Sequence, residues 1–121
     1  MAAGELEVTV RDDGDTATID LAGDVDSAAE SALEEGYRQA LAGGSKTIVL
    51  DFSGAAYINS SGIALIVSLL GQARGHGIEV QARGLSDHYR EIFEITRLAD
   101  FLAINPDEDS AVRGAEGTTD A

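Results

Sequence analysis

Four consecutive residues, Asn59, Ser60, Ser61 and Gly62, form the segment of the sequence best suited to chemistry. A helical apolar pattern begins directly after them, so the two serines are expected at the start of a helix. A helix start offers unpaired backbone N–H groups and a partial positive charge, which favour an anion such as a phosphate. A phosphate on Ser60 adds about −1.5 to −2 charges. This charge would disrupt the binding of a partner that packs on Ser60. The domain itself would tolerate it, because the helix start can accommodate a negative charge.

The same serines also have a purely structural interpretation. Ser60 and Ser61 are good helix-capping residues, and capping is the commoner role of a serine pair at a predicted helix start. The residues alone therefore leave two hypotheses open, a modification site and a helix cap.

Patterns for catalysis or for metal and nucleotide binding are incomplete elsewhere in the chain. His88 and Asp87 could belong to a hydrolase site, but the sequence lacks the Gly-x-Ser-x-Gly motif that carries the nucleophile. Residues 44–47 resemble the end of a phosphate-binding loop, but the glycine spacing is wrong and a strand follows. There is no cysteine, and the 2 histidines are too few for a typical zinc site. The sequence predicts no enzyme activity, no metal and no other cofactor.

Length and charge restrict the classes of partner. The 121 residues suffice for one domain, and 8 Lys and Arg against 22 Asp and Glu give a net charge of −14. This excess of acid argues against binding nucleic acid or anionic lipid headgroups. It favours a basic or neutral protein surface as partner, although solubility alone is an alternative explanation.

The sequence contains no pattern typical of a targeting or membrane-spanning segment. Its first residues lack a basic region followed by an apolar stretch. The longest nearly apolar run, residues 63–70, is far shorter than the roughly 20 residues that span a bilayer. We expect a cytoplasmic protein without direct membrane insertion.

The elements that must position the serines alternate along the chain. Apolar periodicities predict strands over residues 6–10, 16–22, 47–50 and 78–82, with a last short strand or turn over 101–104. Helices are predicted from Ser27, from Ser60 or Ser61, and from Ser86 or Asp87. This order predicts a single α/β domain. Its mixed sheet of four to five strands has an N-terminal antiparallel hairpin and βαβ crossovers, with helices packed on it.

The helix after Ser60 has two apolar faces. The predicted core face consists of Ile63, Ile66, Val67 and Leu70. Leu65 and Leu69 lie off this face, where a surface helix is normally polar. They are either buried beneath another element or exposed as a patch for a partner.

The segment from Asp51 to Gly62 resembles the signature of the STAS domain family, in particular the bacterial anti-sigma factor antagonists. In that signature an aspartate ends a central strand, an aromatic and an aliphatic residue follow, and the run ends in Asp-Ser-Ser/Thr-Gly. Residues 21–26 and 85–101 are similar to the family's entry to the first helix and to its third helix. The resemblance covers residues 5–104, predicted as a STAS domain. Residues 105–121 are predicted as an acidic C-terminal tail, a short helix or disordered.

The resemblance implies a partner-switching protein. Unphosphorylated antagonist binds an anti-sigma factor that is also a serine kinase of the histidine-kinase-like ATPase fold, and so frees the sigma factor for transcription. The kinase phosphorylates the serine that maps to Ser60 and releases the antagonist, and a PP2C-type phosphatase resets it. The predicted partner-binding residues are Gly23, Asp24, Asp26, Asn59, Ser60, Ser61, Gly62, Leu65 and Leu69.

One position departs from the family pattern. The residue before the phosphoacceptor is usually aspartate, and here it is Asn59. Asparagine keeps the size and the carbonyl acceptor, but it cannot act as a base toward the Ser60 hydroxyl. It also removes a negative charge that would repel the phosphate.

Two other functions remain open at this stage. The domain could be a phosphorylation-independent STAS subunit of a signalling scaffold or of an ABC-type lipid transporter, with Asn59 and Ser60 as interface residues. A small hydrolase or nucleotide-dependent enzyme is a third hypothesis. It lacks a recognisable nucleophile–base pair and an intact phosphate loop.

Overall fold

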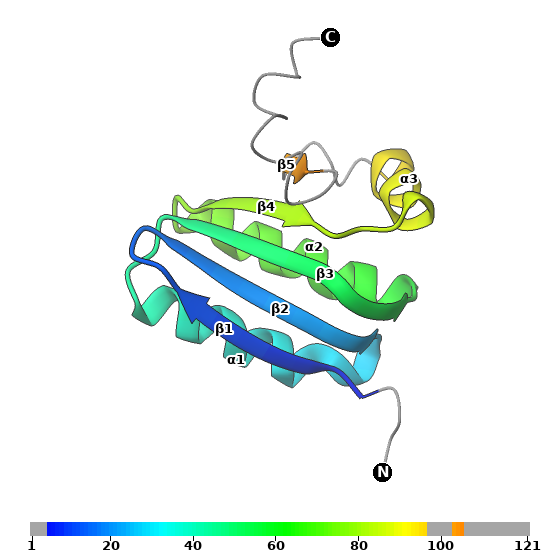
Figure 1. The fold of residues 1–121 in the computed structure, drawn as a ribbon, viewed down its shortest axis with the longest axis horizontal. Helices are drawn as coiled ribbons and strands as arrows, with labels where there is room; N and C mark the ends of the chain where they lie inside the picture. Colours follow the sequence, from blue (N-terminus) through cyan, green and yellow to red (C-terminus); the bar gives the residue numbers. More distant parts are fainter. Residues whose placement is uncertain (1–4, 97–102, 106–121) are drawn as a thin grey trace, which may run out of the picture.

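The computed structural model of the chain describes residues 5–96 and 103–105, and its centre is a five-stranded sheet (Figure 1). The strands follow in chain order: β1 Glu7–Asp12, β2 Thr16–Val25, β3 Thr47–Ile58, β4 Glu79–Arg83 and β5 Ala103–Asn105. β1 pairs with β2 antiparallel, and every later pair is parallel. The predicted mixed sheet with an antiparallel hairpin is confirmed. The predicted tail lies outside the described residues apart from Asn105.

Two helices cover one face of this sheet and a third lies near the end of β4 (Figure 1). They are α1 (Glu30–Ala42), α2 (Ser60–Gly75) and α3 (Asp87–Ile95). α1 connects β2 to β3, and α2 connects β3 to β4, which are the crossovers that parallel strands require. The core between helices and sheet includes the almost fully buried side chains of Ile19, Leu21, Ile48, Leu50 and Ile66.

The start of the first helix differs from the prediction. Ser27 and Glu30 fit the sequence pattern of a capping box, but it is the Asp26 Oδ1 that accepts a hydrogen bond from the Ala28 N–H, at 3.0 Å. A short 3-10 turn, Ser27–Ala29, then leads into α1. The carboxylate of Asp26 is therefore tied to the local backbone.

β3 is much longer than the predicted strand over residues 47–50. It continues to Ile58 because its register with β2 shifts at two places, between Asp20 and Ala22 and between Gly23 and Asp24. At each shift β3 carries one extra residue, as in a β-bulge. The periodic pattern is lost there, but the pairing persists. The strand therefore leads directly to Asn59, whereas the sequence pattern predicts a loop between the end of the strand and residues 57–59.

The buried face of α2 is rotated relative to the prediction. Val67, predicted in the core, is 47% exposed, whereas Leu69 is only 4% exposed. The reason is that α2 packs against α1 as well as against the sheet. Leu69 and Leu65 lie beside Leu33 and Tyr37 of α1. Of the two alternatives for the second apolar face, burial beneath another element holds for Leu69.

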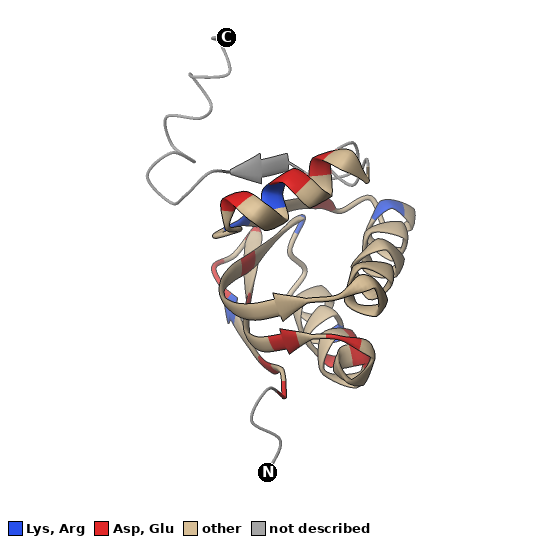
Figure 2. Cartoon of the chain, turned by 90° about the vertical axis from the view of Figure 1, so that its right-hand side faces the viewer, with Lys and Arg blue, Asp and Glu red and all other residues tan. Residues whose placement is uncertain are grey.

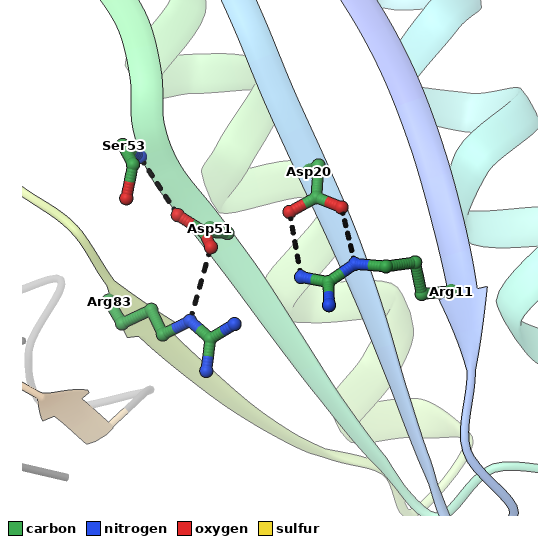
Figure 3. Close-up of polar contacts among 5 residues, drawn as sticks. All are labelled: Arg11, Asp20, Asp51, Ser53 and Arg83. Atoms are coloured by element: carbon green, nitrogen blue, oxygen red, sulfur yellow. Dashed lines mark hydrogen bonds and ion pairs between the residues drawn. The ribbon is translucent and has the colours of Figure 1, made fainter. Parts of the chain in front are cut away.

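Two ion pairs lie on the sheet face away from α1 and α2 (Figure 3). Arg11 binds both carboxylate oxygens of Asp20, at 2.7 and 3.0 Å, and this pair is exposed. The Asp51 carboxylate accepts hydrogen bonds from Arg83 Nε at 3.2 Å and from the Ser53 N–H at 2.9 Å. The second pair is largely shielded from solvent and joins the parallel strands β3 and β4.

The charge state of Asp51 should make stability depend on pH. Burial acts to raise the pKa of Asp51, but hydrogen bonds from Ser53 and the Arg83 guanidinium outweigh it, so the pKa lies below its ordinary value of 3.8. A lowered pKa stabilises the fold above that value, and the gain is lost as the pH falls through the folded pKa. We expect Asp51→Asn to lower the free energy of unfolding at pH 7 by about 1–3 kcal/mol.

Urea denaturation at pH 7 and at about pH 3 measures this effect, and the difference from wild type should shrink at the lower pH. Asp20→Asn is the matched control, because an exposed pair contributes only about 0–1 kcal/mol. If the two variants lost the same free energy of unfolding at pH 7, the shielded Asp51 pair would stabilise the fold no more than the exposed Asp20 pair does.

Candidate functional site

The carboxyl ends of β2 and β3 bring the predicted site residues together. Val25 and Ile58 are the last paired residues of these parallel strands. The Asn59 N–H donates to the Val25 carbonyl at 3.2 Å, so the two chain segments remain joined where the strands end. In open α/β sheets the carboxyl ends of strands are the usual place for ligands and partners.

Asn59 is the capping residue of α2. Its Oδ1 accepts a hydrogen bond from the Gly62 N–H at 2.9 Å, and its backbone carbonyl accepts from the Ile63 N–H. The interpretation of Ser60 and Ser61 as mere helix caps is therefore wrong. Asparagine and aspartate cap helices about equally well, so the departure from the family pattern preserves the local structure.

Ser60 and Ser61 are the first two residues of α2, and both are exposed. Neither hydroxyl is hydrogen-bonded to any residue within the described part of the chain. The first turn of α2 carries no acidic residue, so no carboxylate there offsets the partial positive charge of the helix start. The site therefore presents an available hydroxyl where an anion is electrostatically favoured.

Gly62 allows the helix start to approach β2 this closely. A Cβ atom at this position would lie 1.9 Å from the Val25 carbonyl oxygen and 2.6 Å from its carbon. Glycine is thus the residue type that fits. Gly62 and Leu69 are both buried within the domain, and their assignment as partner-binding residues stays a prediction.

The β2 side of the site consists of Gly23, Asp24 and Asp26, all partly exposed. Gly23 has a φ of +119°, a conformation that favours glycine. Asp24 lies opposite Tyr57 in the pairing of β2 with β3. Gly23 and Asp24 thus lie in the strand that pairs with the end of β3, and Asp26 directly follows that strand.

From Ser60 to Ala73 the exposed face of α2 is uncharged and consists mostly of small and apolar residues. No Asp, Glu, Lys or Arg occurs from residue 53 to residue 73. The exposed residues of α2 within this stretch are Ser60, Ser61, Ala64, Val67, Ser68, Gly71 and Gln72. Tyr57, 50% exposed, precedes the helix, and Leu65 is half-buried at its side. Acidic residues occur instead on the helices α1 and α3 (Figure 2).

α3 supports the end of β3 through contacts that the sequence reasoning missed. The Tyr89 hydroxyl accepts a hydrogen bond from the Ile58 N–H at 3.0 Å. Phe93 packs edge-on against Phe52, with ring centroids 5.8 Å apart. Ser86 caps α3 by accepting from the Tyr89 N–H. Tyr89 is identifiable from the sequence only as part of an apolar helix face, because its hydroxyl partner is distant in the chain.

Within residues 5–96 and 103–105, no group of three or more His, Asp or Glu side chains is placed to hold a metal ion. None of the helices in that part of the chain is long and apolar enough to cross a membrane.

A family model described as "Mlab, STAS domain" matches residues 8–104, which is most of the chain. The match begins in the first hairpin and includes the whole site around Ser60.

Solved structures show the same fold. An anti-sigma factor antagonist from Mycobacterium paratuberculosis is 22% identical, with a TM-score of 0.71 over 93% of this chain and 96% of that chain. The Bacillus cell fate determinant SpoIIAA in its phosphorylated form is 19% identical, with a TM-score of 0.65 over 88% and 97%. RsbS from Moorella thermoacetica, in a variant form, is 12% identical, with a TM-score of 0.72 over 94% and 98%.

Proposed function

Because the chain belongs to the STAS domain family, we propose that it is an anti-sigma factor antagonist whose binding is switched off by phosphorylation of Ser60. Its partner is an anti-sigma factor that is also a serine kinase of the histidine-kinase-like ATPase fold. Capture of this kinase in the cytoplasm frees a sigma factor for transcription. A PP2C-type phosphatase removes the phosphate and restores binding. The domain itself is a binding module without catalysis.

One observation carries this proposal: the exposed Ser60 hydroxyl stands at the start of α2, and Asn59 already caps the helix. The hydroxyl can accept a phosphoryl group without loss of the cap. The helix start stabilises the new charge locally, whereas a partner packed on the uncharged face of α2 meets a charge that it must desolvate. The existence of SpoIIAA in a phosphorylated form supports the same chemistry for a protein of this fold.

Asn59 determines what the kinase must provide. During transfer the Ser60 oxygen attacks the γ-phosphorus of ATP, ADP leaves, and the serine proton must pass to a base. The Asn59 amide is not a base and its oxygen is occupied by the Gly62 N–H. The kinase therefore supplies the catalytic carboxylate, and the antagonist supplies a positioned hydroxyl.

The test is a phosphorylation assay with the serine kinase encoded nearest to this chain in its genome. The purified protein is incubated with kinase and Mg-ATP, and its intact mass is measured. We expect one added phosphate in the wild type and in Ser61→Ala, and none in Ser60→Ala. Phosphate on Ser60→Ala at the wild-type rate would place the modification elsewhere.

A second candidate is the phosphorylation-independent STAS subunit of a signalling scaffold or an ABC-type lipid transporter. It is favoured by Asn59, which replaces the usual aspartate, and by the description of the matching family as "Mlab". In that case α2 and Ser60 form a permanent interface. An ATPase and permease encoded beside the chain, with no kinase or phosphatase, would favour this candidate.

A further inference from the structure

The last part of β3 has a strand neighbour on one side only. β3 pairs with β4 as far as Asp51 and Arg83, so residues 52–58 run past the end of β4 (Figure 1). On this side, no strand within the described part of the chain pairs with them. Ile58 is buried, and a buried N–H group without an acceptor costs free energy. The Ile58 N–H therefore needs an acceptor that is not a strand.

The Tyr89 hydroxyl is this acceptor, at 3.0 Å from the Ile58 nitrogen. Two contacts hold Tyr89 in place. Its own N–H donates to the side chain of Ser86, which caps α3. One turn later the fully buried Phe93 packs edge-on against Phe52 of β3. α3 thus takes the place of a neighbouring strand at the last residue of β3.

The position of the Ser60 hydroxyl depends on the backbone that precedes it. The exposed Ser60 side chain makes no hydrogen bond within the described part of the chain. On the side of β2, the Asn59 N–H donates to the Val25 carbonyl, and the Asn59 side chain accepts from the Gly62 N–H. On the side of α3, the bond from Ile58 to the Tyr89 hydroxyl holds the same stretch of backbone. The start of α2 is therefore fixed from both sides.

We propose that Tyr89 is a positioning residue for the phosphoryl acceptor: through Ile58, its hydroxyl keeps the Ser60 hydroxyl in line for attack. This inference rests on the proposed function, because positioning matters only if Ser60 reacts. Phosphoryl transfer depends mostly on positioning and electrostatic stabilisation, and a misplacement of about 1 Å can cost roughly 100-fold in rate. Loss of the Tyr89 hydroxyl should therefore slow the transfer step more than it weakens partner binding.

Amide hydrogen exchange of the ¹⁵N-labelled full chain, followed by NMR, tests the contact without a kinase. Tyr89→Phe keeps the ring and removes only the acceptor. Relative to the core amides of β2, we expect the amides of Ile58 and Gly62 to exchange about threefold to tenfold faster than in wild type. Unchanged exchange of both amides would overturn the proposal.

Tyr37→Phe is the matched control for the loss of a hydroxyl. The Tyr37 hydroxyl is hydrogen-bonded to His76 Nδ1 at 2.8 Å, and His76 caps the opposite end of α2. This variant also loses one partly buried hydrogen bond, but far along the helix from Ser60. Measured against the core amides of β2, it should leave the exchange at Ile58 and Gly62 unchanged.

Phosphorylation kinetics test the consequence, with Mg-ATP and the serine kinase encoded nearest to this chain. Tyr89→Phe should lower kcat by roughly threefold to thirtyfold and change the KM for this chain by less than about twofold. Tyr37→Phe should change neither constant by more than about twofold. A wild-type kcat in Tyr89→Phe, or a loss confined to KM, would overturn the positioning role. If the wild type takes no phosphate, the proposed function fails, while the exchange experiment still decides whether Tyr89 holds the backbone before Ser60.

Discussion

Ser60→Asp is expected to weaken binding of the kinase partner by roughly 30-fold to 1000-fold. This range corresponds to about 2–4 kcal/mol, the usual cost of placing an unpaired charge in an interface. The physical reason is the composition of the surface, since the residues from 53 to 73 include no charged side chain. Calorimetric titration of wild type and variant against the purified kinase, without ATP, measures the change in Kd.

Two controls make this experiment specific to position 60. Ser60→Ala should bind about as tightly as wild type, because the Ser60 hydroxyl makes no hydrogen bond within the described part of the domain. It should also stay bound after ATP is added. Ser31→Asp places the same charge on another exposed serine, in α1, and should change the Kd by less than about threefold. Tight binding by Ser60→Asp would contradict the switch.

Gly62→Ala should be the most destabilising single change at the site. The added methyl group would overlap the Val25 carbonyl oxygen, from which its Cβ is 1.9 Å away. Either α2 or the end of β2 must then move, which strains the hydrogen bonds of Asn59 to Gly62 and Val25. We expect a loss of about 3 kcal/mol in the free energy of unfolding, measured by urea denaturation.

Gly71→Ala is the matched control in the same helix. A Cβ at Gly71 meets nothing within 4 Å, so alanine gains helix propensity without a clash. We expect a gain of about 0.5–1 kcal/mol. If Gly62→Ala were as stable as Gly71→Ala, the close approach of α2 to β2 would not be the reason for glycine at position 62.

Local patterns were sufficient to predict the order of the elements. The helix starts at Ser60 or Ser61 and at Ser86 or Asp87, and the antiparallel hairpin, all depend on residues close together in the chain. The structure confirms them, with α2 beginning at Ser60 and Ser86 capping α3. The extension of β3 to Ile58 was missed because the register shifts with β2 interrupt the alternation that identifies a strand. Beyond these shifts, β3 remains a strand because it pairs with β2, although its own residues no longer alternate between apolar and polar.

The faces of α2 were harder to predict than its existence. Helical periodicity does not distinguish the face that meets the sheet from the face that meets α1. Val67 was therefore placed in the core, where the structure exposes it, and Leu69 was left open between burial and exposure. The cap was misassigned for a similar reason, because Asn59, Ser60 and Ser61 are all good capping residues. Only the backbone conformation places Asn59 outside the helix and the serines inside it.

The most direct test of the switch is phosphopeptide mapping, with intact mass, of the chain isolated from its own cells. Stressed and unstressed cultures are compared. We expect a single phosphate on Ser60, with an occupancy that changes between the two conditions, despite Asn59 at the preceding position. An abundant protein with Ser60 unmodified under every condition would contradict the switch and leave a phosphorylation-independent binding domain.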